Sequence, residues 1–397
     1  MKLPLANHNH NFWDKLKLAY FLLTKRWSMG EKVAELEKKL AEKSGYKYCV
    51  ATSSGSTANT LLAMWIAKNT TKRKIVVSAN TWSTTITPFI NLGFEPVFVD
   101  VDKDSPLMDC HQLDKTLKEH DGEIAAVFYT TLLGIRRGAA VDDYLNKIKN
   151  FCELNKVELY VDSCEDTMGM FRDGQLKKSN GEAEIIKAET TSFYLAHEFQ
   201  ACPEMGAIFT NDVNQYEFYF MARNHGMTRN LENNSRFRND LVDSKFEFAV
   251  VGNNFRPTEL SAYAVSLDLK RDQEFRIGIA RDFYYSGSKK IYHYGTDIYH
   301  RGSDYMFALP IVVRQEYGEK YAKYCIDKIK SFAEELGIET RPIVGGNLLR
   351  QTIFQRYGDY RDYPNAEWFH EYGIYVGLYR NMNKKLLFKF RDRIANL

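Results

Sequence analysis

The sequence lacks the long apolar segments that mark membrane-spanning and secreted proteins. No run of about 18 apolar residues occurs, so no membrane span is expected. The first segment, MKLPLANHNHNFWDKLK, has no apolar core of the kind found in a secretory signal. The apolar run LKLAYFLLTKRW, at 16–27, is short and bordered by basic residues. We therefore expect an amphipathic helix there and not a membrane anchor.

Cysteine is also sparse. Six cysteines occur in 397 residues, and no two of them have CxxC spacing. A chain of this length can build a core without disulfides, so we expect reduced thiols and a cytoplasmic protein. A zinc site or an iron–sulfur cluster would need ligands closer together in the sequence, so no metal is expected. The cysteines are Cys49, Cys110, Cys152, Cys164, Cys202 and Cys325.

Neither sign of charge is in large excess. The formal net charge is +3, which is too small to indicate a nucleic-acid partner. It is compatible with a local basic pocket for an anionic substrate. Hydrophobic residues make up 44% of the chain and aromatic residues 14%, enough for a large core. The length favours two domains, or one large α/β domain with an appendage.

Strand and helix patterns alternate along most of the chain before residue 262, which predicts an α/β fold with a large, mostly parallel sheet. Beyond residue 262 the alternation is less regular and favours a smaller α+β domain. We expect an N-terminal arm at 1–30, a large α/β domain at 31–262 and a C-terminal domain at 263–397. Apolar runs predict strands at 46–55, 74–80, 95–102, 124–134, 157–166 and 207–212. Helical spacing predicts helices at 31–43, 55–68, 84–93, 111–120 and 142–156.

A turn of small residues, SSGSTANT at 53–60, follows the first predicted strand. Backbone N–H groups at the start of a helix suit a phosphate, and Gly55 allows a close approach. Ser56 and Thr57 add hydroxyl donors. A plain helix cap has the same composition, so both a phosphate site and a simple cap stay open.

Two further residues follow predicted strands, at the edge of a parallel sheet where functional side chains gather. Trp82 is suited to stacking on a flat ring, or to packing in the core. Asp162 ends a buried strand, and a buried carboxylate needs a partner. A protonated pyridine nitrogen, as in a pyridoxal cofactor, is one such partner, and a helix N-terminus is the alternative. Glu165 lies in the same turn.

The segment SFYLAH, at 192–197, has the layout of one that presents a reactive lysine, but its last residue is His197. Ser192 is a further candidate donor to a phosphate. A single histidine is more often structural or exposed, so His197 gains weight only from the three features above.

These four features, in this order, resemble the DegT/DnrJ/EryC1 family of the aspartate aminotransferase superfamily, which has pyridoxal-phosphate fold type I. The family motif Ser-Phe-x-x-x-Lys carries the lysine that binds the cofactor covalently, and 192–197 match it with histidine in the lysine position. Segments such as MGEKVAELE, HGMTRNL, GNNFRPTEL and GIETRPIVGGN extend the resemblance over nearly the whole chain. Histidine at this position is typical of a subgroup, the nucleotide-sugar 3-dehydratases.

The resemblance implies a pyridoxal or pyridoxamine 5′-phosphate cofactor and assigns roles to named positions. It implies that the phosphate is bound by Gly55, Ser56 and Ser192, with Asn254 reaching it from a neighbouring subunit. The functional unit is then a homodimer with shared active sites. Trp82 is expected to stack on the ring, and Asp162 to hold the pyridinium nitrogen, with Glu165 as the alternative partner. The sugar nucleotide is expected near His225, Arg229 and Arg341.

The resemblance also implies a reaction, the loss of the C3 hydroxyl from a nucleotide-linked 4-keto-6-deoxysugar, with GDP as the preferred nucleotide. The cofactor works in its pyridoxamine form, which L-glutamate regenerates. An imidazole suits the base, because its ordinary pKa of about 6.5 keeps it neutral near physiological pH. Two alternatives stay open: a sugar aminotransferase that uses a displaced lysine such as Lys187, and a non-catalytic homologue that binds cofactor or sugar nucleotide.

Three segments depart from the family pattern. The residues after His197 read Pro203-Glu204-Met205-Gly206 and include one apparent insertion, and the turn after Asp162 also looks one residue longer. The loop LLGIRRG, at 132–138, replaces a Gly-Asn-Pro type of loop. Its Arg136 and Arg137 either meet a phosphate or face solvent. These changes leave the substrate less well defined than the cofactor site.

Overall fold

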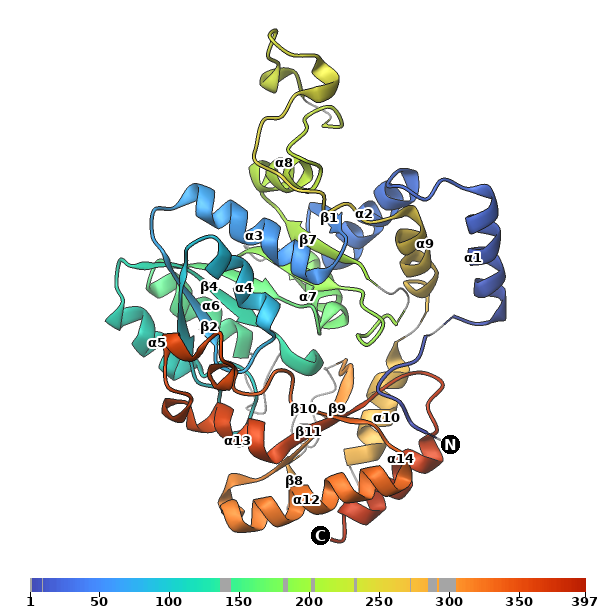
Figure 1. The fold of residues 1–397 in the computed structure, drawn as a ribbon, viewed down its shortest axis with the longest axis vertical. Helices are drawn as coiled ribbons and strands as arrows, with labels where there is room; N and C mark the ends of the chain where they lie inside the picture. The colour runs from blue at the N-terminus through green and yellow to red at the C-terminus, as the bar shows by residue number, and fades with distance from the viewer. Residues whose placement is uncertain are drawn as a thin grey trace.

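The computed structural model describes residues 2–8, 10–135, 144–180, 185–200, 204–231, 234–271, 273–284, 291–292 and 305–397. Two sheets organise them (Figure 1). The predicted Arg136 and Arg137, together with Cys202 and Pro203, lie outside these ranges.

The larger sheet has seven strands in the order β1-β7-β6-β5-β4-β2-β3. Strands β2 to β6 run parallel, and β7 is antiparallel to both of its neighbours. Most of its strand residues are buried, which is why these strands read as continuous apolar runs and not as alternating patterns. The strands are β1 (Tyr48–Thr52), β2 (Lys74–Ser78), β3 (Glu95–Val99), β4 (Ile124–Thr130), β5 (Glu158–Asp162), β6 (Ile186–Ser192) and β7 (Gly206–Thr210).

Helices connect and cover this sheet. α3 packs along β6 and β7 and against α4 and α8, whereas α2 packs against β1, α7 and α9. The helices are α2 (Glu31–Ser44), α3 (Gly55–Asn69), α4 (Ser83–Asn91), α5 (Cys110–Glu119), α6 (Tyr144–Leu154), α7 (Thr167–Asn180), α8 (Val213–Arg223) and α9 (Glu259–Asp268). The predicted α/β fold with a mostly parallel sheet is confirmed.

The smaller sheet has the antiparallel order β10-β11-β9-β8 and lies beside the carboxyl-terminal helices (Figure 1). Its strands are β8 (Ile291–Tyr292), β9 (Ala308–Val313), β10 (Thr340–Pro342) and β11 (Gly373–Gly377). The remaining helices are α1 (Phe12–Thr24), α10 (Glu274–Tyr284), α12 (Glu319–Leu336), α13 (Pro364–Tyr372) and α14 (Lys384–Ile394). Leu3 pairs with Ile338, so the first residues of the chain lie beside this part of the fold. The boundaries at residues 30 and 262 stay predictions.

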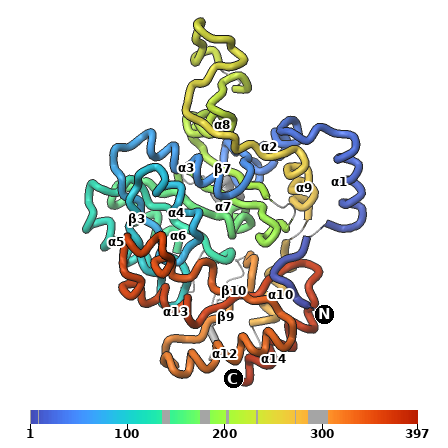
Figure 2. The backbone as a smooth tube through the Cα atoms, viewed as in Figure 1, coloured from blue at the N-terminus to red at the C-terminus, as the bar shows by residue number. Residues whose placement is uncertain are grey.

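Two segments extend from the body. Helix α1 stands at one side, and the chain between α8 and α9 forms a long excursion at one end (Figure 2). Helix α1 begins with a reciprocal cap, in which Asn11 and Asp14 each accept the other's main-chain N–H. Among the described residues, every helix is too short or too polar to cross a membrane.

The parallel strands determine where the site forms. Strands β2, β4, β5 and β6 all end at the same edge of the sheet, and the turns that follow them carry the polar residues. β6 and β7 are paired neighbours, with Ser192 opposite Gly206, so the intervening chain with His197 is an excursion from one sheet edge.

Candidate active site

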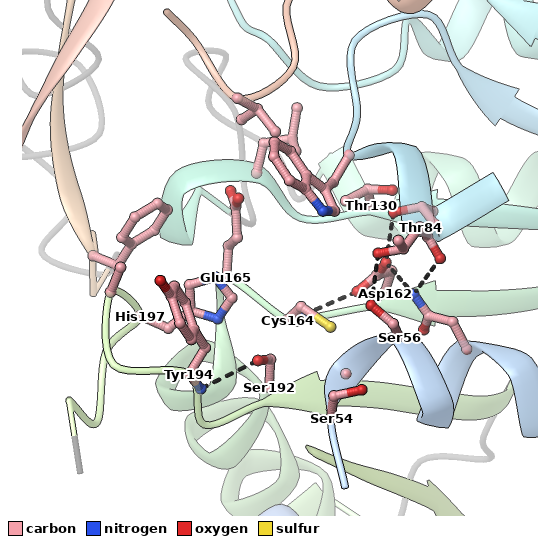
Figure 3. A pocket seen from close by; sticks show the side chains of 18 of the residues that line it. Ser54, Ser56, Thr84, Thr130, Asp162, Cys164, Glu165, Ser192, Tyr194 and His197 are labelled. Carbon is pink, nitrogen blue, oxygen red and sulfur yellow. Dashed lines mark hydrogen bonds between the residues drawn. The ribbon is translucent and has the colours of Figure 1, made fainter. Parts of the chain in front are cut away.

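A cavity of about 390 Å³ lies at this edge of the sheet (Figure 3). It is bounded by the start of α3, the turns after β2, β4, β5 and β6, and residues from the smaller sheet. Seven of the site residues predicted from the sequence line it: Gly55, Ser56, Trp82, Asp162, Glu165, Ser192 and His197.

One end of the cavity is formed by the N-terminus of α3. The helix cap is Ser54, whose side chain accepts the N–H of Thr57 at 3.2 Å. Ser56 is therefore not the cap, and its hydroxyl instead donates to Thr84 Oγ1 at 2.9 Å. A helix N-terminus favours a bound anion through its N–H groups and its dipole.

Gly55 lies where no side chain fits. A Cβ at this position would lie 2.7 Å from Cys164 Sγ and 2.9 Å from Ser192 Cβ. The close approach of Gly55 to Ser192 brings the start of α3 against the end of β6. The two predicted phosphate segments therefore meet at one end of the cavity.

Asp162 is a buried carboxylate with a full set of donors. Its side chain is 2% exposed, and Oδ2 accepts hydrogen bonds from Asn59 Nδ2 at 2.9 Å and Thr85 Oγ1 at 2.8 Å. Oδ1 accepts the N–H of Cys164 at 3.1 Å. All three partners donate, which suits an ionised acceptor.

The alternative role for Asp162, a helix cap, does not fit the structure. Helix α7 begins only at Thr167, and Asp162 accepts the N–H of Cys164 within the preceding turn. The carboxylate is instead held at the cavity wall, where a cationic N–H of a bound ring would meet it. The donor set thus fits the pyridinium group of a pyridoxal cofactor.

Glu165 is held differently from Asp162. It accepts the N–H of Leu133 at 2.7 Å, and Leu133 has a left-handed conformation with φ of 57°. Burial raises the pKa of Glu165 to about 8, against the lowering effect of the Leu133 hydrogen bond. Asp162 adds to this rise through charge repulsion, and Glu165, Asp162 and His197 all line the cavity.

The ring of His197 lies between two aromatic side chains. Its centroid is 5.6 Å from that of Tyr194 and 5.6 Å from that of Phe307, both in edge-on arrangements. His197 is exposed only in part and lines the cavity. Removal from bulk water lowers the pKa of His197 to about 4, so the imidazole is neutral at physiological pH. Its Nδ1 has no hydrogen-bond partner among the described residues.

Lysine is absent from the described residues that line the cavity. Lys187, the candidate for a displaced lysine, lies near the start of β6 as predicted and is exposed. Ser192 ends the same strand at the cavity, so Lys187 is at the far end of the strand. Within the part of the chain that the structure describes, no lysine lines the cavity where it could bind a cofactor.

Four predicted residues do not line the cavity of this subunit: His225, Arg229, Asn254 and Arg341. Asn254 is exposed, bridges to Asn224 and accepts from Arg256 Nε at 2.9 Å. His225 has a positive φ of 62° and donates its N–H to Asn253. Arg229 is exposed.

Arg341 is connected to the site through a residue that lines the cavity. It is in β10, directly opposite Tyr375 of β11, and Tyr375 lines the cavity. Its guanidinium pairs with Glu339 at 3.0 Å and is largely exposed. Arg341 is thus positioned at the rim of the cavity.

Several lining residues were not singled out from the sequence. Asn59 had a visible signal, since it is a polar residue one turn after Gly55 in an otherwise apolar helix. Thr85 lies in the first turn of a predicted helix, and Thr130 lies inside a predicted strand, where it ends β4. Phe307, Val344 and Tyr375 come from the smaller sheet and its turns, and no local pattern in the sequence connects them with the cavity.

Comparisons with known proteins agree with this geometry. Residues 14–389 match the model of the DegT/DnrJ/EryC1/StrS aminotransferase family. The chain is 30% identical to GDP-4-keto-6-deoxy-D-mannose 3-dehydratase of Escherichia coli O55:H7, with 94% of each chain covered. It is 29% identical to the Yersinia pseudotuberculosis protein of the same name, with 95% of this chain and 94% of that protein covered. The solved E. coli GDP-4-keto-6-deoxy-D-mannose-3-dehydratase with bound hydrated PLP superposes with a TM-score of 0.81 at 25% identity, covering 100% of this chain and 99% of that one.

Proposed function

The chain belongs to the DegT/DnrJ/EryC1/StrS aminotransferase family, and from this premise we propose that it is a pyridoxal-phosphate-dependent nucleotide-sugar 3-dehydratase. The proposed reaction removes the C3 hydroxyl of a 4-keto-6-deoxyhexose, with GDP-4-keto-6-deoxy-D-mannose as the first substrate to consider. One observation carries the proposal: His197, at the position of the family's lysine, lines the same cavity as the residues proposed to hold the cofactor.

The cavity offers a matching group for each part of the cofactor. Gly55, Ser56 and Ser192 would hold the phosphate, at the N-terminus of α3. Trp82 lines the cavity with 55% of its surface exposed, which leaves its face available for stacking on a ring. Asp162 would accept the hydrogen bond of the ring nitrogen. In its pyridoxamine form the cofactor would supply an amine for the sugar C4 ketone and an electron sink for the electron pair that remains when a proton is removed beside it.

His197 is proposed to be the base. A neutral imidazole can accept a proton at physiological pH, and burial keeps His197 in this form. The edge-on contacts with Tyr194 and Phe307 restrict the plane of the ring. An imidazole does not anchor the cofactor covalently as a lysine amine does, so the noncovalent contacts of Asp162, Gly55 and Ser56 must retain it.

The amino donor and the fate of the product follow from the same proposal. L-glutamate would regenerate the pyridoxamine form after each turnover. Hydrolysis of the unsaturated aminosugar would release ammonia and leave a 4-keto-3,6-dideoxysugar, a precursor for deoxysugar biosynthesis in the cytoplasm.

We further propose a homodimer with shared active sites. Asn254 lies outside the cavity of its own subunit, as expected if it serves the site of a partner. Helix α1 exposes Trp13 at 68% and Leu23 at 85%, and the excursion after α8 exposes Leu241 at 91%. Exposed apolar residues of this size favour a protein contact. A second cavity of about 310 Å³, lined by Arg256 and Thr258 among others, shares Glu204 with the first.

The sugar nucleotide is proposed to contact Arg341 at the rim of the cavity, and His225 and Arg229 through the dimer. Both arginines are exposed and could meet a diphosphate. The choice of GDP rests on similarity to the relatives alone. It does not rest on any residue assigned here to guanine recognition.

The two alternative functions are less well supported. An aminotransferase needs a lysine at the cofactor, and the described lining residues include none. Asp162 and its three donors argue against a decayed cofactor site, because a buried carboxylate is costly where no bound group needs it.

The test is turnover of purified protein with pyridoxamine 5′-phosphate, L-glutamate and a panel of GDP-, CDP-, dTDP- and UDP-linked 4-keto-6-deoxysugars. We expect loss of the C3 hydroxyl, fastest with the GDP-linked sugar. Borohydride treatment of the protein with pyridoxal 5′-phosphate should leave every lysine unmodified at the site. A reduced lysine adduct, or transamination without C3 deoxygenation, would contradict the dehydratase assignment.

A further inference from the structure

Arg276, in α10, is a fully buried arginine outside the lining of the cavity. Its side chain is 0% exposed. Nη1 donates to the main-chain carbonyl oxygens of Met306, Phe307 and Leu378 at 3.4, 3.3 and 2.7 Å, and Nη2 donates to the carbonyl oxygen of Glu198. One guanidinium therefore joins three segments that are far apart in the sequence.

The buried charge is well accommodated. Burial lowers the pKa of Arg276 to about 10, so the guanidinium is still protonated at physiological pH. Glu198 and Asp268 favour the cation, whereas Arg380 opposes it. A guanidinium presents several N–H donors in a fixed plane, which allows it to bind several carbonyls at once.

Two of the three segments hold the proposed base. Glu198 directly follows His197, and the ring of Phe307 packs edge-on against the His197 ring at 5.6 Å. Arg276 thus fixes the main chain beside the imidazole and also the main chain that carries the ring packed against it.

Glu198 is held from a second direction by its side chain. Its Oε2 accepts the N–H of Met168, in the first turn of α7, at 2.9 Å. The N–H of His197 itself donates to the carbonyl of Tyr194 at 2.9 Å. Glu198 is therefore fixed to α7 through Met168 and to α10 through Arg276, and the main chain before His197 is fixed beside the large sheet.

We propose that Arg276 is a positioning residue for His197, acting through the carbonyls of Glu198 and Phe307 and touching neither cofactor nor substrate. The inference rests on the proposed function, in which His197 is the base. A displacement of about 1 Å in a reacting group can lower the rate about a hundredfold. Loss of the Arg276 contacts should therefore lower kcat and leave the KM for the sugar nucleotide nearly unchanged.

The test compares Arg276→Lys with Arg223→Lys. Lysine keeps the charge but cannot reach several carbonyls at once. Arg223 is a matched control, because it is 1% exposed, donates to the carbonyl of Ala51 and pairs with Glu37, away from His197. Measurements are thermal unfolding, kcat and KM at saturating cofactor, and the pKa of His197 from NMR of protein with ¹³C-labelled histidine rings, assigned with His197→Asn.

We expect both lysine variants to unfold at lower temperature than the wild type. Only Arg276→Lys should lower kcat, by about ten- to a hundredfold, and move the pKa of His197 upward toward its ordinary value as water reaches the ring. Equal losses of stability with an unchanged kcat and an unchanged His197 pKa would reduce Arg276 to a structural role.

A milder variant covers the case in which Arg276→Lys does not fold. Gln273→Leu removes the side-chain oxygen that accepts from Arg276 Nε at 3.4 Å and leaves the guanidinium in place. It should move the His197 resonance and lower kcat in the same direction by a smaller factor, and no change in either would overturn the proposal. The NMR measurement needs no turnover, so it tests Arg276 even if the dehydratase assay fails in the wild-type protein.

Discussion

The side-chain amide of Asn59 donates to Oδ2 of Asp162 at 2.9 Å, from one turn inside the helix that begins at the phosphate end of the cavity. The amide is itself oriented by Thr190, whose hydroxyl donates to Asn59 Oδ1 at 2.6 Å. The two ends of the cofactor site are therefore connected through a single helix, because α3 provides both its N-terminus and the amide that fixes Asp162.

Asn59→Leu should weaken binding of pyridoxal 5′-phosphate about ten- to a hundredfold, since a hydrogen bond to a charged group contributes about 1.5–3 kcal/mol. The dissociation constant can be measured by absorbance titration. Asn69→Leu, at the exposed end of the same helix, is the control and should bind as the wild type does. Equal affinities of the two variants would show that Asp162 does not depend on Asn59.

Asp162→Asn should weaken cofactor binding and turnover together, because a neutral amide no longer stabilises a protonated pyridine nitrogen. The absorbance spectrum of the bound cofactor reports the protonation state of the ring. Glu165→Gln is the comparison, since Glu165 lines the same cavity but its hydrogen-bond partner is the N–H of Leu133. If Glu165→Gln changes the ring spectrum and Asp162→Asn does not, the assignment of the pyridinium partner is wrong.

His197→Asn should lower the dehydration rate by about 10²–10⁴ and leave cofactor affinity nearly unchanged, because it removes the proton acceptor but no proposed binding contact. The measurements are kcat with the preferred sugar nucleotide and the dissociation constant of the cofactor. His111→Asn, at an exposed position on α5, controls for the substitution itself. A fully active His197→Asn enzyme would exclude His197 as the base.

Glu165 and His197 should give the protein opposite dependences of stability on pH. The pKa of Glu165 is raised to about 8, so the folded state binds the extra proton and stability falls as pH rises between the ordinary carboxyl pKa and about 8. The pKa of His197 is lowered to about 4, so the unfolded state binds the extra proton and stability falls as pH decreases from about 6.5 to about 4.

Denaturant unfolding across this range tests both signs. In the wild type, Glu165 should lower the free energy of unfolding as pH rises, by at most about 1.4 kcal/mol per pH unit, and Glu165→Gln should remove this slope. His197→Asn should lose part of the destabilisation toward low pH. Parallel stability curves for the wild type and a variant would show that the group in question titrates normally in the folded protein.

Gly55→Ala should destabilise the fold by about 1–3 kcal/mol and weaken cofactor binding, because the new methyl group would lie too close to Cys164 and Ser192. Gly278→Ala is the matched control, since a Cβ there meets no atom within 4 Å and the residue lies within α10. The control should be neutral or slightly stabilising. Equal thermal stability and affinity in both variants would mean that the α3 terminus can shift without cost.

The sequence was sufficient for the parts of the site that depend on local pattern. Apolar runs ending in polar residues predicted the parallel sheet, and with it the place of Gly55 and Asp162 at one edge. Strand β6, which ends at Ser192, was not among the strands predicted from apolar runs, and Ser192 was assigned to the site from its motif. The contribution of Phe307 was not predictable, because it arises from the packing of the smaller sheet against the large one, and such a contact leaves no periodic signal. The choice between ring partner and helix cap for Asp162 likewise needed the position at which α7 begins.

The pKa values of His197 and Glu165 could not be predicted from the sequence either, since they depend on burial by residues distant in the chain. Asn254 is a different case. It is exposed and does not line the cavity of its own subunit, so its role in a partner's site stays a proposal.

The pairing of Ser192 with Gly206, extended by the hydrogen bond from Phe193 N–H to the carbonyl of Met205, closes the segment that carries His197 at its base. The entropy of closing a loop grows only slowly with its length, so residues can be added between His197 and Met205 at little cost. The one-residue insertion predicted for this segment would be a variation of this kind. During divergence the chain between His197 and Met205 could lengthen or change composition while His197 stayed in register with the sheet.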